Sequence, residues 1–105
     1  MDLRQLESAL AAFAVFDPTH LPIHFVQIFL LVGREGQMTF QELMGELNLT
    51  NSAISRSVMA MGEIHRKGKP GFDLLETRKD HREGRRFLVS LSPKGKALYR
   101  QLQGL

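Results

Sequence analysis

Apolar residues recur early in the chain at the spacing of an amphipathic helix. Four of them, three or four positions apart, form one seam: Leu3, Leu6, Leu10 and Phe13. This spacing predicts a helix over residues 2–16, which ends at Asp17 because the residue before proline disfavours the helical conformation. A second helix is predicted over about 22–33, where Gly33 and Gly36 mark its exit. It is apolar nearly all round, so it belongs in the middle of a core.

Two shorter helices follow, and each is preceded by a capping threonine. Thr39 and Glu42 have the spacing of a capping box, in which hydroxyl and carboxylate satisfy backbone donors reciprocally. Thr50 caps the next helix, which is predicted to run to about residue 64. Its inward positions recur at i, i+4 and i+7: Ile54, Val58 and Met61. A capped helix, a three-residue turn and a second capped helix form the order of a helix-turn-helix.

The remaining third of the chain predicts a hairpin and a last helix. Residues 72–78 and 87–91 have strand-like patterns and flank a strongly charged turn. Ser92 is a suitable cap and Pro93 a suitable first residue for the closing helix. The fold class expected is mainly α with a small β-hairpin (α+β). We expect one domain over residues 1–105, divided into N-terminal helices (1–34), helix-turn-helix (39–65), hairpin (72–91) and closing helix (92–105).

Composition narrows the classes of protein that remain. The 105 residues are 43% hydrophobic and 24% charged, an ordinary globular balance. The chain has no cysteine, which excludes a disulfide scaffold, a thiolate zinc finger and an iron–sulfur cluster. Its net charge of +3 divides unevenly, because residues 1–52 carry −4 and residues 53–105 carry +7. A basic half beside an acidic half indicates a directed surface for an anionic partner, although a merely solvated basic face fits the charge equally well.

The start of the second capped helix has the side chains that a DNA major groove requires. Short hydrogen-bonding groups let the backbone approach the base edges, and an arginine can reach guanine or phosphate. A methionine on the same face could contact a thymine methyl. The candidate residues are Thr50, Asn51, Ser52, Ser55, Arg56 and Met59. The alternative is that these are ordinary solvent-facing helix residues.

Two basic segments follow this helix. The first is a loop with Arg66, Lys67 and Lys69. The second is the hairpin tip, where five cations crowd into nine residues: Arg78, Lys79, Arg82, Arg85 and Arg86. A narrow basic finger can enter a minor groove, where negative potential is concentrated. The alternative is a solubilising loop, partly neutralised by Asp80 and Glu83.

Residues 39–98 resemble the winged helix-turn-helix core of MarR-type transcriptional regulators. The matching pieces are TFQELMGELNLTNSAISRSVMAM, the Asp80-His81-Arg82 step in the wing, and LSPKGKAL at 91–98. The resemblance implies Ser52, Ser55 and Arg56 in the major groove, Asp80 orienting the wing arginines, and Arg82 or Arg85 reaching the minor groove. Family members are homodimers that read palindromic DNA. The compact sequence is also similar to small phage or mobile-element versions.

These observations predict a sequence-specific, double-stranded DNA-binding regulator with a winged helix-turn-helix fold. The basic half then holds most of the reading helix, the wing and the closing helix, the segments that a winged helix turns toward DNA. Two alternatives stay open: a protein–protein adaptor on the same scaffold and a non-specific architectural DNA binder. We expect a cytoplasmic protein, bacterial or in the host cytoplasm if phage-encoded, because the sequence predicts neither a signal peptide nor a membrane span.

The N-terminal seam and the remaining residues complete the prediction. Leu3, Leu6, Leu10 and Phe13 either pack on the chain's own core or pair with the same helix of a second chain, and we favour a homodimer. His20 and His24 lack the further ligands of a metal site. We expect no cofactor, no metal and no enzymatic activity. A small-molecule effector is possible, but no motif supports it.

Overall fold

The computed structural model describes residues 2–63 and 70–105, and within this part the side chains of residues 83–85 are left out. Five helices and three strands occupy these ranges. In chain order they are α1 (Leu3–Ala14), α2 (Ile23–Glu35), β1 (Gln37–Thr39), α3 (Phe40–Leu47), α4 (Asn51–Ala60), β2 (Leu75–Asp80), β3 (Glu83–Leu91) and α5 (Pro93–Gln103). The mainly α fold with a β-hairpin is confirmed.

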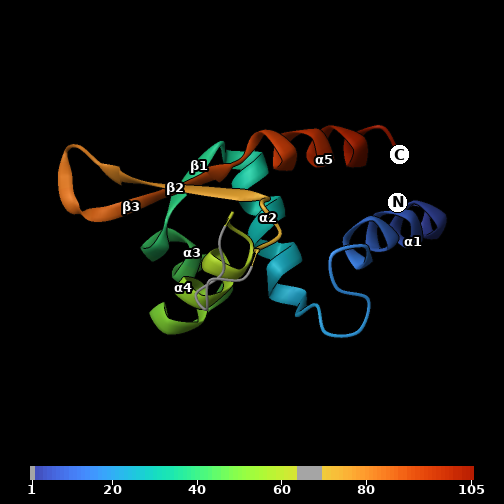
Figure 1. Ribbon diagram of the computed structural model, residues 1–105, viewed down its shortest axis with the longest axis horizontal. Helices are drawn as coiled ribbons and strands as arrows, with labels where there is room; N and C mark the ends of the chain where they lie inside the picture. The colour runs from blue at the N-terminus through green and yellow to red at the C-terminus, as the bar shows by residue number, and fades with distance from the viewer. Residues whose placement is uncertain (1, 64–69) are drawn as a thin grey trace.

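The elements are arranged around α2, with the hairpin and α1 at opposite ends of a molecule 43 × 28 × 26 Å in extent. In Figure 1 the β2–β3 hairpin projects to one side, α3 and α4 lie below the sheet, and α5 lies above it. The helix-turn-helix and the hairpin therefore form one end of the molecule. The two chain ends meet at the other end, where Gln5 Nε2 donates to the backbone oxygen of Leu105 at 3.0 Å.

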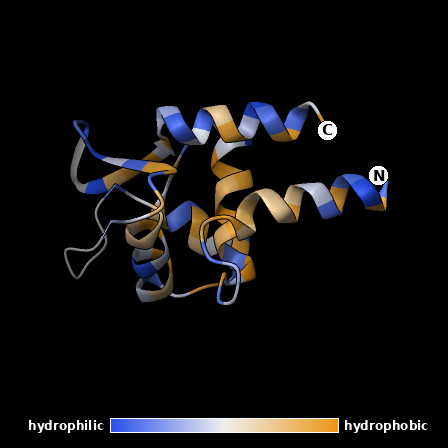
Figure 2. Cartoon of the chain, turned by 45° about the vertical axis from the view of Figure 1, so that its right-hand side comes forward, coloured by the Kyte–Doolittle hydropathy of each residue, from blue (hydrophilic) through white to orange (hydrophobic). Residues whose placement is uncertain are grey.

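The predicted central position of α2 is confirmed by its burial. Ile28, Phe29 and Val32 are completely buried, and Figure 2 shows this helix as the most apolar in the molecule. Phe13 of α1 packs edge-on against Phe29, with ring centroids 5.3 Å apart. Burying large side chains of this kind stabilises the fold by about 1.5–3 kcal/mol each. The core thus ties α1 to the helix that supports the rest of the chain.

The sheet has one more strand than the predicted hairpin. Its order is β1-β3-β2, with both neighbours antiparallel to β3. Met38 of β1 and Thr77 of β2 both pair with Val89, which is completely buried. The prediction missed β1 because three residues are too few to display an alternating pattern. This strand anchors the hairpin base to the start of α3.

The link between α4 and β2 differs from the prediction at both ends. Helix α4 ends at Ala60 rather than near residue 64, and β2 begins at Leu75 rather than at residue 72. Asp73 adopts a left-handed φ of 57°. The backbone donors of Phe72 and Asp73 bind the carbonyls of Ala60 and Gly62, at 3.1 and 2.9 Å. Residues 72–73 are therefore used to close the end of α4, and this long-range pairing was not visible in local patterns.

Candidate nucleic-acid interface

The helix-turn-helix is defined by the residues that end α3 and that cap α3 and α4. Asn48 ends α3 in the left-handed conformation, which asparagine tolerates better than most residues. Thr39 and Glu42 form the predicted capping box at the start of α3, with bonds of 3.0 and 2.9 Å. Thr50 Oγ1 accepts from the Ala53 backbone at 3.1 Å. Both predicted caps are confirmed, and each stabilises its helix by about 1 kcal/mol.

Helix α4 is fixed on its inner side and open on its outer side. Ile54 and Val58 are buried in the core, and Ser57 turns its hydroxyl back to the Ala53 carbonyl at 2.7 Å. The outer side carries the predicted reading residues around one shallow hollow of about 320 Å³: Asn51, Ser52, Ser55, Arg56 and Met59. The structure brings these five together, and Thr50 lies exposed just before them. The surface offers small polar groups, one guanidinium and one apolar side chain 40% exposed.

The tip of the wing is organised by a buried carboxylate. Asp80 is 7% exposed, and its Oδ1 accepts from the backbone N–H of Arg82 at 2.9 Å. Its Oδ2 accepts from Nε of Arg86 at 2.9 Å and also from Nη2 of that guanidinium. The Arg82 backbone N–H first, and then the Arg86 guanidinium, hold the pKa of Asp80 below its usual value. Asp80 thus pairs with a wing arginine and shapes the turn.

The basic residues of the wing have different partners. Arg78 Nη2 donates to Gln37 Oε1 of β1 at 2.6 Å, so this guanidinium is tied across the sheet. Arg86 is held by Asp80. Lys79 near the end of β2 and Arg82 in the turn between β2 and β3 are exposed. Among the described side chains of the wing, all four of these cations are exposed, and Arg78 and Arg86 are in addition held by side-chain hydrogen bonds.

Some predicted residues lie outside the described part of the chain. Arg66, Lys67 and Lys69 fall in the segment 64–69, and the side chain of Arg85 is also left out. Their placement in a DNA contact stays a prediction.

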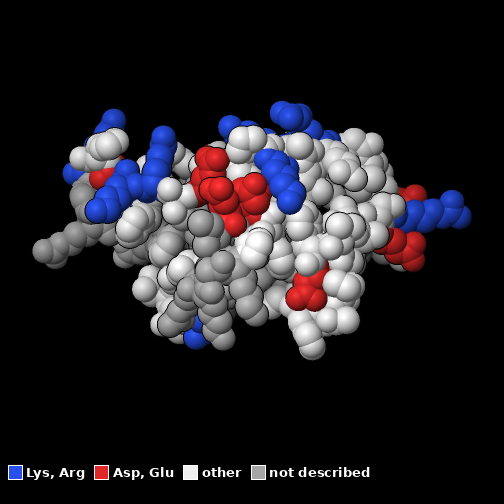
Figure 3. Space-filling view, viewed as in Figure 1, with Lys and Arg blue, Asp and Glu red and all other residues white. Residues whose placement is uncertain are grey.

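The closing helix does not share the surface of α4 and the wing. Figure 1 shows α5 on the far side of the sheet from α3 and α4, and Figure 2 agrees from a second direction. In Figure 3, Lys and Arg gather over the wing at one end, whereas those of α5 follow the upper edge. That the whole basic half turns toward DNA stays a prediction, and Lys94, Lys96 and Arg100 lie on α5, on the other side of the sheet from α4.

The four apolar residues of the N-terminal seam differ in how far they are buried in the chain's own core. Phe13 is 4% exposed and belongs to the chain's own core. Leu3, Leu6 and Leu10 are 73%, 38% and 44% exposed. The first three positions of the seam form an uncovered apolar row on α1, next to the end of α5.

Two further expectations concern metals and membranes. Within residues 2–63 and 70–105, no three metal-ligating side chains lie together in a way that could hold an ion. In the same ranges, none of the helices combines the length and apolar character needed to cross a bilayer.

The arrangement of a helix-turn-helix followed by a β-wing and a closing helix is the winged-helix fold. Solved structures of MarR-family regulators have the same fold. A mutant of MarR from E. coli complexed with operator DNA superimposes with a TM-score of 0.65 at 17% identity, covering 97% of this chain and 68% of that one. AbsC, a MarR family transcriptional regulator from Streptomyces coelicolor, gives 0.69 at 18% identity, covering 96% and 60%. The adhesin competence repressor AdcR from Streptococcus pyogenes gives 0.63 at 16%, covering 96% and 69%.

These similarities establish the fold, and the chain spans 60–69% of the length of the three proteins. No family model matches the sequence, and no curated protein matches it. The structure therefore shows the winged-helix fold that the sequence motifs predicted.

Proposed function

We propose that this protein is a sequence-specific, double-stranded DNA-binding transcriptional regulator, and that residues 1–105 act as one winged-helix domain. The observation that carries the proposal is the outer side of α4. Asn51, Ser52, Ser55 and Arg56 surround one hollow at the start of a capped helix. Short polar side chains there let a helix enter a major groove and offer hydrogen bonds to base edges.

The wing supplies the second contact of this proposal. Lys79 and Arg82 are exposed at the end of the wing, and a minor groove would attract them because it concentrates negative potential. Arg78 and Arg86, held by Gln37 and Asp80, add positive charge at fixed positions. A protein with the same fold has been solved in complex with operator DNA, which supports a DNA-binding role for this fold.

We further propose that the protein acts as a homodimer through α1. The exposed row of Leu3, Leu6 and Leu10 is the feature that supports it, because a repeated apolar stripe on a helix is suited to pairing with its own copy. Phe13 supports the row from within the core rather than joining the contact.

Selection from a random-sequence DNA pool, followed by sequencing, tests both proposals. We expect an enriched palindrome whose half-sites are one helical turn apart, about 10 base pairs between centres, because a two-fold dimer reads two equivalent sites. Enrichment of a single half-site would support sequence-specific DNA binding and contradict the proposed homodimer. A pool without enrichment but with binding would identify a non-specific architectural protein, and a pool without binding would favour the adaptor.

Substitution of Arg56 by alanine locates the reader within the fold. We expect Arg56→Ala to lower affinity for the selected site by about 1–3 kcal/mol while affinity for random DNA changes less. Lys96→Ala on α5 is the matched control, since it removes one exposed cation on the other side of the sheet. Competition gel shifts with selected and random duplexes give both affinities. Unchanged discrimination in Arg56→Ala would mean that α4 does not read the sequence.

A further inference from the structure

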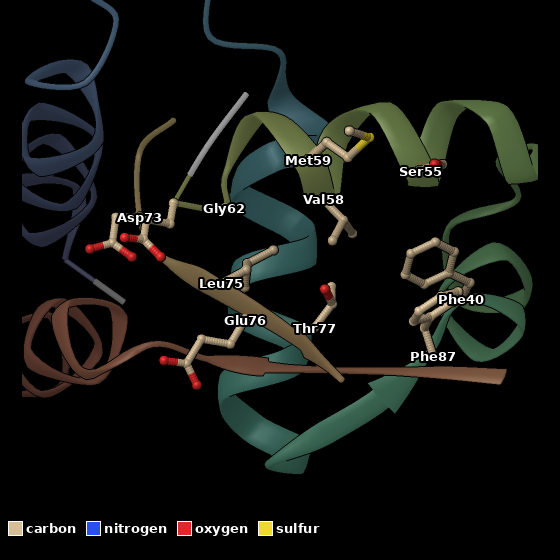
Figure 4. A pocket seen from close by; sticks show the side chains of 11 residues that line it. Phe40, Ser55, Val58, Met59, Gly62, Asp73, Leu75, Glu76, Thr77 and Phe87 are labelled. Carbon is tan, nitrogen blue, oxygen red and sulfur yellow. The ribbon is translucent and has the colours of Figure 1, made fainter. Parts of the chain in front are cut away.

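A groove separates α4 from the strands of the wing. Its volume is about 700 Å³, and its sides come from α3, α4, β2 and β3. Val58 and Leu75 lie in its middle (Figure 4), and each is only 2% exposed. Ser55 and Met59 of α4 line both this groove and the hollow of the proposed reading surface, whereas Asn51 and Arg56 line only the hollow. The groove therefore adjoins the proposed reading surface and shares two residues with it.

One end of the groove is aromatic and open to water. The rings of Phe40 and Phe87 lie there with centroids 6.1 Å apart and planes tilted by 32°. Phe87 is 41% exposed and Met59 is 40% exposed, although both are large apolar side chains. Covering such surface is favourable by about 25 cal/mol for each Å² removed from water. This end favours an apolar or aromatic group as occupant.

The other end of the groove is acidic. Glu63, Asp73 and Glu76 line it, and Figure 4 shows Asp73 and Glu76 on the side away from the two phenylalanines. Within the described residues, none of the three carboxylates has a hydrogen bond or an ion pair to a side chain. Figure 3 shows a group of acidic side chains in the middle of this face. Like charges gathered at one place favour a cation, which lowers their mutual repulsion.

We propose that this groove binds a small amphipathic cation, an amine or ammonium compound with an aromatic or alkyl body. The charged group would lie among Asp73, Glu76 and Glu63, and the body would lie on Met59 and the rings of Phe40 and Phe87. The volume is in the range of pockets that hold small organic ligands. The complementary ends orient such a ligand in one direction. The carboxylates also exclude DNA phosphates from that end by repulsion.

Three compounds with one body and different head groups test the proposal: 4-phenylbutylamine, 4-phenylbutanol and 4-phenylbutyrate. Titration into the full chain without DNA, followed by calorimetry and by the NMR signal of the Met59 methyl, measures binding at the groove. We expect the amine to bind at least about tenfold more tightly than the alcohol, a difference of about 1.4 kcal/mol, and the acid to bind most weakly. Equal affinities, no binding of the amine, or an unmoved Met59 signal would overturn the proposal.

Two substitutions separate the charged end from the body of the groove. Asp73→Asn and Glu76→Gln together remove two charges at nearly constant shape, and asparagine tolerates the left-handed φ at position 73. We expect the double variant to lose about tenfold in affinity for the amine and little for the alcohol. Glu46→Gln on α3 is the control, because it removes an exposed carboxylate that does not line the groove.

A thermal melt of each variant shows whether the fold is retained. An unchanged amine affinity in a folded double variant contradicts the proposal. If the double variant does not fold, the single variant Glu76→Gln must still lower the affinity for the amine more than Glu46→Gln does. These readouts need no DNA, so they stand or fall separately from the proposed regulatory function.

Discussion

At the scale of single residues, several glycines occupy places where another element leaves no room for a side chain. A Cβ at Gly33 would overlap the ring of Tyr99 from α5, and a Cβ at Gly95 would overlap the carbonyl of Leu74. Helix α2 runs to Glu35, so Gly33 lies within the helix and does not mark its exit as predicted. The exit is formed by Gly36, at a φ of 87°. These glycines are needed for close approach between α2, α5 and the strand that leads into the wing.

Substitution of Gly33 by alanine measures this close approach. We expect Gly33→Ala to lower the free energy of unfolding by about 1–3 kcal/mol, because the Tyr99 ring must move out of a packed position. Gly45→Ala on α3 is the matched control. Nothing lies within 4 Å of its added Cβ, so the helix should gain about 0.5–1 kcal/mol. Urea unfolding of both variants gives the two values, and a stabilised Gly33→Ala would show that the ring gives way freely.

At the scale of elements, those with local signals could be predicted and those that depend on distant partners could not. Thr39, Thr50 and Ser92 cap the helices that they were predicted to cap, because a cap is made within three residues. Strand β1 and the segment after α4 take their conformation from β3 and from the α4 carbonyls. The candidate reading residues followed from helical spacing, whereas the groove beside them joins residues from four elements and had no signal in the sequence.

The wing should respond to acid through Asp80. Its pKa is lowered in the fold, so the stabilisation is present above the carboxyl's unfolded pKa and is lost as the pH falls through the folded value. We expect the NMR signals of the Arg82 amide and the Arg86 Nε–H to shift together below about pH 4. Asp80→Asn should abolish this step, and Glu76→Gln on the same strand should leave it in place. Signals of Arg82 and Arg86 that stay constant into strong acid would contradict the assigned role of Asp80.

At the scale of the whole molecule, the described cations of the wing lie at one end and those of α5 lie along one edge (Figure 3). Lys79 and Arg82 are exposed at the end of the wing, whereas Lys94, Lys96 and Arg100 belong to α5, which lies on the other side of the sheet from α4. Net charge and sequence position could not separate these two groups. The fold separates them, and this separation makes the electrostatic part of the proposed function testable.

The salt dependence of DNA binding should distinguish the two groups of cations. We expect the logarithm of affinity to fall steeply and linearly with the logarithm of salt concentration, because phosphate contacts release counterions. Lys79→Ala and Arg82→Ala should each reduce the slope by about 1, whereas Lys94→Ala and Lys96→Ala should leave it unchanged. Fluorescence anisotropy over a salt series gives the slopes. Equal slopes for all four variants would remove the wing from the contact.

The order of strands in the sheet has a consequence for how the chain folds during synthesis. Strand β3 lies in the centre and is the last of the three to leave the ribosome, while β1 and β2 pair only with it. Until residue 91 has emerged, both earlier strands expose unpaired edges, which are prone to association with other nascent chains. The sheet therefore closes only after its central strand has emerged.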